Sequence, residues 1–492
     1  MRRLIYRISL LFSALLILNS CADDYLDTTP TDAIDKDQAF STIKNVWGAL
    51  NGIHRAMFMQ YDRMDQAGQG SMMINFDMLG EDLVMNSSGN GWFNSTYKWR
   101  NHRSESSSMT FYSYRFYYKL IANANMIIHN VDGVVGPEEE KKAIKGQALA
   151  YRGWAHFMLV QMFGERYVAG QNNKQLGVPL MTEVTIEPQK RALVEEVYEQ
   201  INKDLDEAIL NLDAGIGREY ISHISVEVAK GVKARVALAM QDWETAATYA
   251  NEARTGFDLM SEKEYLSGFN SVDNPEWMWG SEQISIQNNY FYSFFAFMSA
   301  NFSSSNIKSN PKSINSTLYH QIADTDYRKQ LWSETGQEDD FPIPPGGKRY
   351  PYINKKFLAE NSGSSIGDIP YMRASEMYLI EAEAKAQLGL YGEAADLLYA
   401  LAIQRDEKYV KSTKIGQELI DEIMLQRRIE LWGEGFRFLD LKRTNSKLDR
   451  TGANHKESLS IVMEVAPGDK KWQFLIPRDE LNANDSIAQN PL

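Results

Sequence analysis

The sequence is almost without cysteine, since only one of its 492 residues, Cys21, is of this type. A single cysteine cannot form a disulfide within the chain, which excludes the cross-linked framework of many small exported domains. The fold must therefore be held by its core, and 43% of the residues are hydrophobic and 11% aromatic. By length alone, the chain could form two or three domains.

Long hydrophobic runs are missing as well. After residue 20, no stretch reaches about 18 consecutive apolar residues, the length that a membrane-spanning helix requires. We therefore predict no membrane-spanning helix in this part of the chain.

The common catalytic and metal-binding motifs are also missing. The chain has no Gly-x-Ser-x-Gly, no His-Glu-x-x-His, no P-loop and no EF-hand loop. Its seven histidines are scattered, and no two lie four residues apart on a recognisable helix. We therefore predict that the protein is not an enzyme and has no cofactor or metal ion. Acidic pairs are abundant, so a glycosidase-like pair of carboxylates remains the alternative.

Positive charge is in the minority. The chain has 52 Lys and Arg against 65 Asp and Glu, a net charge of −13. Residues 1–20 contain three arginines and no acidic residue, which leaves 49 positive against 65 negative, or −16, for the rest. An acidic surface argues against nucleic acid and anionic membrane surfaces as partners, but a neutral ligand is compatible with it.

The N-terminus has the pattern of a secretory signal. Three arginines precede an apolar run over residues 8–18 that is too short to span a bilayer. The run ends in Leu18-Asn19-Ser20-Cys21, which resembles the cleavage site of bacterial lipoproteins, where the cysteine becomes the lipidated first residue. We predict a signal peptide at 1–20, followed by a lipidated N-terminus and tether at 21–35. An ordinary signal peptide with a chance cysteine is the alternative.

The residues after the cysteine bear on where an anchored protein would lie. Asp23-Asp24 resembles the surface-export signal of Bacteroidota lipoproteins, although a solvated tether would be acidic by default. Bacterial lipoproteins resemble one another in carrying two or three acyl chains, and each buried CH₂ contributes roughly 0.8 kcal/mol. We therefore predict a stable lipid anchor and exposure at the cell surface.

Apolar residues recur at helical spacing along most of the remaining chain. In the segment 191–213, Val197, Ile201 and Leu205 follow one another in steps of four. We predict a mostly α-helical single domain over 36–492. The same periodicity predicts further helices at 36–60, 109–131, 138–163, 226–240, 243–256, 372–388, 391–405 and 417–433.

Two pairs of these predicted helices are joined by short turns of similar sequence, Gln241-Asp242-Trp243 and Leu388-Gly389-Leu390-Tyr391. Each turn has a small or polar corner, then an aromatic residue, and then an alanine three residues later, which resembles a tetratricopeptide repeat. The turns lie far apart in the sequence. We therefore predict an α-α superhelix of tetratricopeptide-like helical pairs that is interrupted along the chain.

Two stretches lack helical periodicity. Residues 61–108 mix glycine, asparagine, serine and aromatic residues, and residues 257–371 combine short β-like runs with many Asn and Ser. Long irregular stretches inside a domain are usually functional. We predict that these two inserts form an irregular, ligand-facing region with short strands.

Both inserts combine aromatic and short polar side chains, a composition that suits neutral sugars with their apolar C–H faces and hydroxyl groups. Glycine and asparagine predict a loop around Trp92, which places its side chain toward solvent. We predict as ligand-binding residues Trp92, Asn94 and Tyr97 in the first insert and Tyr290 and Tyr292 in the second; packing in the core is the alternative for each. The tryptophans with apolar or regular surroundings are predicted to be core residues: Trp99, Trp277, Trp279 and Trp332.

Motifs in a fixed order are spread over the whole chain after the signal. They are Cys21-Ala-Asp-Asp-Tyr-Leu-Asp27, Ala148-Leu-Ala-Tyr-Arg152-Gly-Trp-Ala-His-Phe157 through Gly164, Gly177-Val178-Pro179, Pro370-Tyr-Met-Arg373 through Glu383, Arg427-Arg428-Ile-Glu430 through Arg443, and Phe474-Leu-Ile-Pro477 with Gln489-Asn490-Pro491. Together they resemble the SusD/RagB family of outer-membrane nutrient-binding lipoproteins. One departure is Glu165-Arg166 after Gly164, because members of the family usually have Val-Pro at this position.

The resemblance implies a lipid-anchored outer-membrane protein. Such a protein captures an oligosaccharide and delivers it, without catalysis, to a partner TonB-dependent transporter of the SusC type. The loop of Trp92 lies near where the first binding loop of the family falls, whereas the segment 301–316 lacks the stacking aromatic of some relatives. A peptide-capturing protein of the same fold, and a helical-repeat interaction protein without its own ligand, remain the alternatives.

Charged residues recur at spacings of three or four near the C-terminus, at Arg427, Glu430, Glu434, Arg437 and Asp440. Opposite charges at these spacings can pair on one helix face. We predict a salt-bridge network that holds the last helix to its neighbours, in preference to a carboxylate pair for acid–base chemistry.

Overall fold

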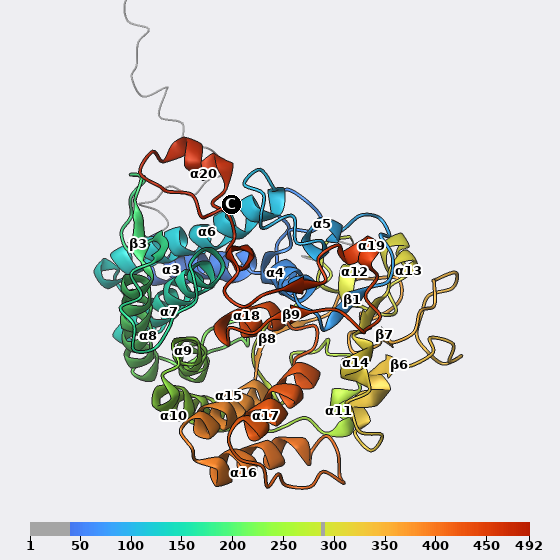
Figure 1. Cartoon of the computed structure of the whole chain (residues 1–492). Helices are drawn as coiled ribbons and strands as arrows, with labels where there is room; N and C mark the ends of the chain where they lie inside the picture. The colour runs from blue at the N-terminus through green and yellow to red at the C-terminus, as the bar shows by residue number, and fades with distance from the viewer. Residues whose placement is uncertain (1–39, 287–290) are drawn as a thin grey trace, which may run out of the picture.

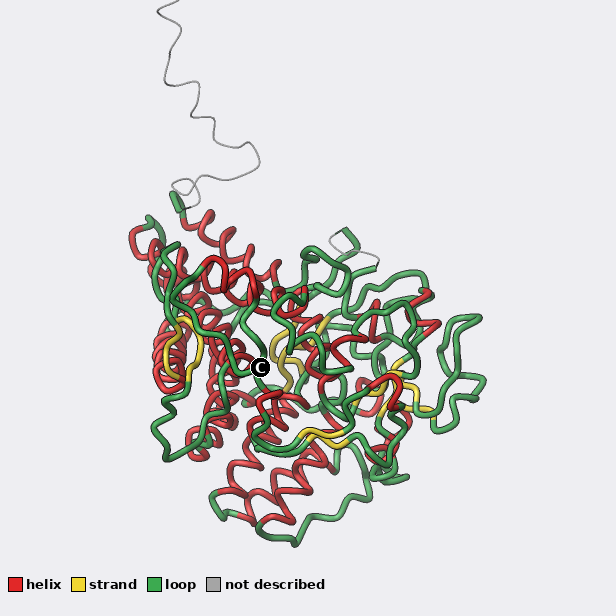
Figure 2. Tube along the Cα trace, turned by 45° about the horizontal axis from the view of Figure 1, so that its top comes forward, coloured by secondary structure: helices red, strands yellow, loops and turns green. Residues whose placement is uncertain are grey.

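The computed structural model describes residues 40–286 and 291–492. The predicted signal peptide, Cys21, the tether and Tyr290 lie outside these residues and stay predictions. In the described part, most long helices gather on the left and at the bottom of Figure 2, and short strands are scattered over the molecule, some of them beside the helices on the left.

Long helices form an arc from the upper left to the bottom of Figure 1. The segments 138–163 and 226–240 are helical over the whole predicted length. Ser107 and Ser225 each accept a backbone N–H at the start of the following helix, as N-caps do. The long helices are α3 (Ile43–Ala56), α6 (Ser108–Asn130), α7 (Glu138–Phe163), α8 (Val194–Asp213), α9 (Val226–Met240), α10 (Trp243–Arg254), α15 (Ala374–Gln387), α16 (Tyr391–Ala402) and α17 (Gln417–Glu430).

The helical pairs form a continuous array in space, although the chain interrupts it. Each helix from α6 to α10 packs on the next, and α10 packs directly on α15, so the second insert leaves no gap between them. At the first turn, Gln241 has a left-handed φ of 62° and Asp242 caps α10. Ala246 and Ala250 are fully buried, which allows the two helices to approach closely. The predicted repeat-like, mostly α-helical fold is confirmed.

The two irregular inserts meet in one antiparallel sheet, on the right in Figure 1. Its strand order is β1 (Leu83–Met85), β5 (Lys312–Ile314), β7 (Ile353–Asn354), β6 (Trp332–Ser333), and Leu83 pairs with Ile314. Three two-stranded sheets complete the strands: β2 (Leu176–Pro179) with β3 (Arg191–Leu193), β4 (Trp277–Ser281) with β8 (Ile369–Arg373), and β9 (Leu448–Asp449) with β10 (Glu464–Val465). The shorter helices are α5 (Asn94–Tyr97), η2 (Val131–Gly133), α11 (Glu262–Tyr265), α12 (Phe295–Met298), α13 (Ser305–Ser309), α14 (Ser316–Tyr319), η3 (Tyr327–Leu331), α18 (Arg437–Arg443), α19 (Glu457–Ser460), η4 (Lys470–Trp472) and α20 (Arg478–Ala483).

The expectation that residues 61–108 are irregular is wrong in part, because α4 (Gly68–Leu79) lies there and is buried along its whole length. A helix that is covered on all sides has no solvent-facing stripe, so its sequence shows no amphipathic periodicity. Its first residue, Gly68, has a φ of 54°, and a Cβ there would lie 1.9 Å from the carbonyl oxygen of Met57. Only glycine fits at this approach.

A cluster of four cations and four carboxylates lies buried between the array and the second insert. Glu430 accepts hydrogen bonds from Arg328 (3.0 Å), Arg373 (2.9 Å) and Arg405 (3.2 Å). Glu434 accepts from Arg373 and Lys356, each at 2.7 Å. None of the eight side chains is more than 5% exposed. We call this set the central ion cluster: Arg328, Lys356, Arg373, Arg405, Glu276, Asp326, Glu430 and Glu434.

The charged residues of the C-terminal motif pair as predicted, but across a turn and not along one helix. The predicted helix at 417–433 stops at Glu430, and Gly433 and Gly435 follow with φ values of 80° and 86°. Arg427 then pairs with Asp440 of α18 at 2.8 Å. These groups serve as structural ion pairs.

The C-terminal segment closes over α4 and the residues that follow it. The buried Arg450 guanidinium donates to the carbonyl oxygens of Met78, Gly80 and Tyr97 at 2.7–3.0 Å. The N–H of Gly435 donates to Asp77 at 2.8 Å. Residues near the end of the chain thus complete the core around α4.

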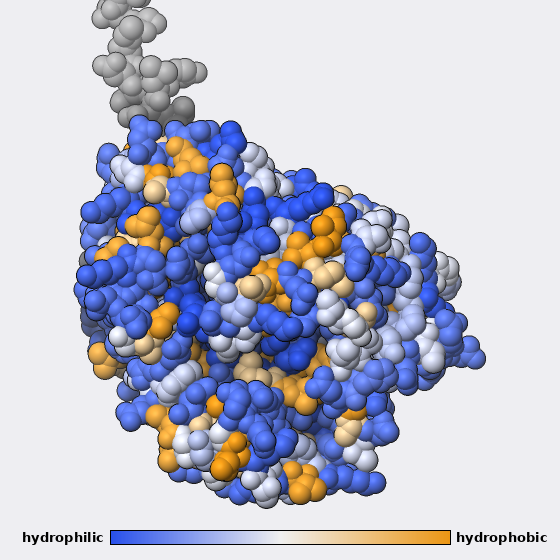
Figure 3. Space-filling model, in the orientation of Figure 1, coloured by the Kyte–Doolittle hydropathy of each residue, from blue (hydrophilic) through white to orange (hydrophobic). Residues whose placement is uncertain are grey.

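The surface is mainly hydrophilic, and hydrophobic residues form small separate groups on the face in Figure 3. Burial of the four predicted core tryptophans, Trp99, Trp277, Trp279 and Trp332, is confirmed, with at most 4% of each exposed. Over residues 40–286 and 291–492, no helix has both the length and the apolar character to cross a bilayer.

Candidate functional site

The loop between β1 and α5 is held in place by polar side chains of the second insert. The Oδ1 atom of Asn310 accepts from the backbone N–H of Asn86 at 3.1 Å, and Asn86 Nδ2 donates to the carbonyl of Pro311 at 2.7 Å. Nearer the tip, Asn90 Nδ2 donates to Ser305 Oγ at 2.9 Å. The loop is therefore positioned by side-chain hydrogen bonds before any ligand arrives.

Trp92 lies half-buried near the end of this loop. Its neighbour Phe93 has a left-handed φ of 61°, and the two rings pack edge-on against Phe297, with centroids 6.1 Å (Trp92) and 5.1 Å (Phe93) away. The guanidinium of Arg63 lies 5.7 Å from the Trp92 ring centroid, which is cation–π range. The indole is thus fixed on a rigid support while part of it stays exposed, as stacking on a sugar ring requires.

The second predicted segment leads into the helix that supports Trp92. Tyr292 is half-buried, its neighbour Phe291 is 52% exposed, and both lead directly into α12, whose Phe297 contacts Trp92. Asn94 is half-buried and donates from Nδ2 to the Ser88 carbonyl at 3.0 Å. We call the following set the Trp92 surface: Arg63, Trp92 and Asn94.

Tyr97 does not belong to this surface, contrary to the prediction. Its side chain is fully buried, its hydroxyl is 2.5 Å from Nδ1 of His455, and the guanidinium of Arg450 lies 4.6 Å from its ring centroid. Burial raises the pKa of Tyr97 to about 12, so the hydroxyl stays protonated. Because α5 turns Tyr97 inward while the preceding loop carries Trp92 outward, residues five apart have opposite environments.

Two exposed residues, Arg63 and Phe291, were not predicted from the sequence. Arg63 has no local signal, because it lies in a stretch without periodicity and reaches Trp92 only through the fold. Phe291 stands beside Tyr292 in the aromatic run and shares its composition signal. The segment 301–316, which lacks a tryptophan, supplies Ser305 and Asn310 to hold the Trp92 loop.

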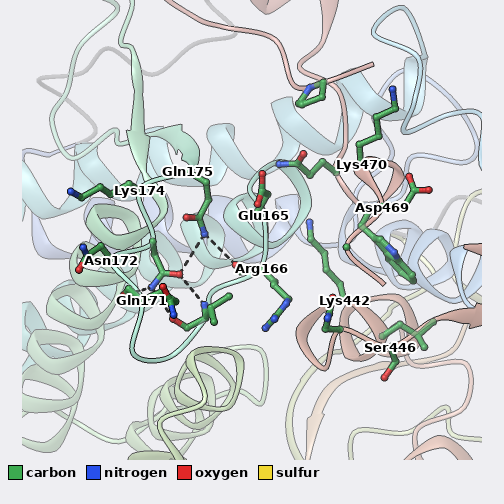
Figure 4. Close-up of a pocket in the computed structure, with 18 residues that line it drawn as sticks. Glu165, Arg166, Gln171, Asn172, Lys174, Gln175, Lys442, Ser446, Asp469 and Lys470 are labelled. Atoms are coloured by element: carbon green, nitrogen blue, oxygen red, sulfur yellow. Dashed lines mark hydrogen bonds between the residues drawn. The ribbon is translucent and has the colours of Figure 1, made fainter. Parts of the chain in front are cut away.

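A polar cavity of about 690 Å³ lies elsewhere, between the loop after α7 and the end of α18 (Figure 4). Its lining includes Arg166, Lys174, Lys442 and Lys470. Lys442 is buried and donates to the carbonyls at the end of α7. Burial lowers the pKa of Lys442 to about 7, and Glu165 opposes this shift.

A repeat-like scaffold that presents a half-exposed tryptophan on a fixed loop is compatible with a ligand-binding protein. The family model described as "SusD family" matches residues 240–492, and the one described as "Starch-binding associating with outer membrane" matches residues 24–238. The chain belongs to the SusD family. Members of this family are binding proteins, generally for glycans, that are associated with the outer membrane and work with its transporters.

Individual relatives agree over nearly the whole chain. SusD-like protein P38 of Formosa agariphila is 24% identical, over 90% of this chain and 92% of its own. The solved structure of a SusD-like carbohydrate binding protein from Bacteroides vulgatus has a TM-score of 0.80 at 27% identity and covers 91% of this chain and 97% of that one. A laminarin binding SusD-like protein shares the fold, with a TM-score of 0.71 at 22% identity over 92% of this chain and 99% of its own.

Proposed function

We propose that this protein captures oligosaccharides at the cell surface and delivers them to a partner TonB-dependent transporter of the SusC type. Membership of the SusD family supports the class of ligand. The solved relative that is named as laminarin binding is an example of a glycan ligand on the same fold.

The observation that carries the proposal is the half-exposed Trp92 on its fixed loop. An aromatic face gives a sugar ring a large contact area, and a held side chain loses little entropy on binding. The neighbouring Arg63 and Asn94 supply donors for hydroxyl groups. With so few anchors, affinity should be modest, about millimolar to micromolar, or roughly −4 to −8 kcal/mol. Such affinity also permits release to a transporter.

Trp92→Ala is expected to weaken oligosaccharide binding about tenfold to a hundredfold, or roughly 1.4 to 2.8 kcal/mol, because the stacking face is removed. A glycan array with protein that lacks residues 1–21 identifies a bound oligosaccharide, and calorimetry then measures both affinities. Trp243→Ala, which removes another half-exposed indole from the helical array, is the matched control and should bind as wild type does. Full affinity in Trp92→Ala would remove Trp92 from the site, and binding of peptide mixtures but no glycan would contradict the proposed ligand class.

The proposed lipid anchor makes a separate prediction. Cys21→Ser is expected to abolish retention in the membrane fraction while the affinity for the oligosaccharide stays unchanged, because the anchor and the Trp92 surface are distinct parts of the chain. Fractionation of cells followed by detection of the protein measures the first effect. A variant that still sediments with the outer membrane would contradict the anchor.

A further inference from the structure

The cavity of about 690 Å³ is framed by a loop that departs from the pattern of the family. This loop spans residues 165–175 and begins with Glu165-Arg166, where Val-Pro is usual. The opposite wall comes from residues 441–446 and 468–473. Figure 4 shows Arg166 between the two walls. The volume is within the range of about 300–1,000 Å³ that small-ligand sites have.

The loop is held rigidly from within. Asn173 is 4% exposed; its Oδ1 accepts from the N–H of Val168 at 2.9 Å, and its Nδ2 donates to Glu195 at 3.0 Å. Gln175 Nε2 donates to the backbone carbonyl of Arg166 at 3.2 Å. A buried asparagine thus fixes the inside of the loop and sets the position from which the Arg166 side chain extends.

The charged groups of the cavity are not balanced. Within the part of the chain that the structure describes, no carboxylate pairs with the Arg166 guanidinium, and the one hydrogen bond of this group is a long one, 3.5 Å to the carbonyl of Tyr167. By contrast, the nearby Arg428 and Arg443 are held by Asp82 and Glu383 at 2.6 Å.

Two further cations of the lining, Lys174 and Lys470, are exposed and pair with no carboxylate among the described residues. Of the two acidic residues there, Asp469 accepts from the backbone of Lys471 at 2.8 Å, and Glu165 lies exposed beside Lys442. In a chain with a net charge of −13, this concentration of unpaired cations calls for an anionic ligand group.

We infer that this cavity is a second ligand site, which takes a uronate unit of an oligosaccharide and binds its carboxylate through the Arg166 guanidinium. The planar guanidinium forms two parallel hydrogen bonds with a carboxylate. Gln171 and Asn172 at the rim supply amide groups for the ring hydroxyls. The inference rests on the proposed capture of glycans and adds an acidic sugar to the ligand class.

The test compares trigalacturonate with the neutral galactotriose by calorimetry, using the full-length protein in detergent. Wild type is expected to bind trigalacturonate more tightly than galactotriose, with an affinity that falls as salt is added. Arg166→Gln should weaken trigalacturonate binding at least tenfold and leave galactotriose unchanged. Lys470→Gln should weaken it in the same direction, which keeps the test valid if Arg166→Gln folds poorly.

Lys447→Gln is the matched control, since Lys447 is 58% exposed, pairs with Asp449 and lies outside the lining. It should bind trigalacturonate as wild type does. Equal affinities of wild type and both cavity variants, or tighter binding of triglutamate than of trigalacturonate, would overturn the inference. If Trp92→Ala loses glycan binding while Arg166→Gln and Lys470→Gln bind as wild type does, the second site is overturned and the proposed function stands. If the wild-type protein binds no glycan, both are contradicted.

Discussion

Arg373→Met is expected to lower the free energy of unfolding by about 3–5 kcal/mol, or to prevent folding altogether. Arg373 is fully buried and donates to Glu276, Glu430 and Glu434 of the central ion cluster. Methionine nearly fills the same space, so the loss comes from the charge. Three carboxylates would remain in the interior with one counterion fewer.

The cluster is held ionised by its own cations. Burial alone would raise the pKa of Glu430, but Arg405, Arg373 and Arg328 outweigh burial and hold it well below the ordinary value. Urea unfolding at pH 7 measures the effect of Arg373→Met. The control is Arg478→Met, which breaks an exposed pair with Glu105 and should cost under about 1 kcal/mol. Similar losses in the two variants would show that the cluster contributes no more than a surface pair.

Acid is expected to destabilise the protein by several kcal/mol between pH 6.5 and pH 4.5, which is a large part of the stability of an ordinary domain. Burial lowers the pKa values of His102, His156 and His455 to about 3, and it lowers that of His54 well below the usual range. Since unfolded histidine titrates near 6.5, the unfolded chain binds more protons below that pH, and stability falls as the pH falls.

Some carboxyls act in the opposite sense, because burial raises the pKa of Asp77, Asp204 and Asp368. Burial raises the pKa of Asp77 to about 8, so the folded state binds this proton more tightly and gains stability as the pH falls from 8. The histidines with a lowered pKa, which include His223, outnumber these carboxyls, so the unfolded chain takes up protons on balance as the pH falls. Each proton taken up on unfolding costs about 1.4 kcal/mol per pH unit once the unfolded imidazoles are protonated, which gives a loss of several kcal/mol.

The hydrogen bonds show why the imidazoles stay neutral. In His156, Nδ1 donates to the Arg152 carbonyl at 3.1 Å, and Nε2 accepts from the N–H of Met181 at 3.3 Å. A second proton would sit on Nε2 and point at the N–H of Met181, so that two donors would face each other.

Urea unfolding between pH 7 and pH 4.5 measures the slope of stability against pH. His156→Gln should make this slope shallower by one proton. Undiminished stability of the wild type at pH 4.5 would contradict the account.

The sequence predicts the scaffold well because apolar residues recur at helical spacing through its long helices. The segments 138–163 and 226–240 match α7 and α9 from end to end. The periodicity does not reveal α4, because no side of this helix faces solvent. The periodicity also predicts a helix that extends beyond the end of α17, because Gly433 and Gly435 turn the chain there.

The candidate site is harder to predict, because composition marks a loop and not the direction of each side chain. Trp92 and Tyr97 share one aromatic segment, yet the first reaches the surface and the second bonds to His455 in the core. Arg63 joins Trp92 through tertiary contacts alone. Residues that meet only in the folded structure leave no regular spacing in the sequence from which their contact could be predicted.

The closure of Arg450 and Gly435 over α4 has a consequence for how the chain folds. During synthesis, α4 leaves the ribosome long before Arg450 is made, so its partners are missing for most of that time. Contacts between residues so far apart in sequence close large loops and slow folding. We therefore expect the core around α4 to close only after residue 450 has been made, a delay that would suit the proposed export of the chain across a membrane.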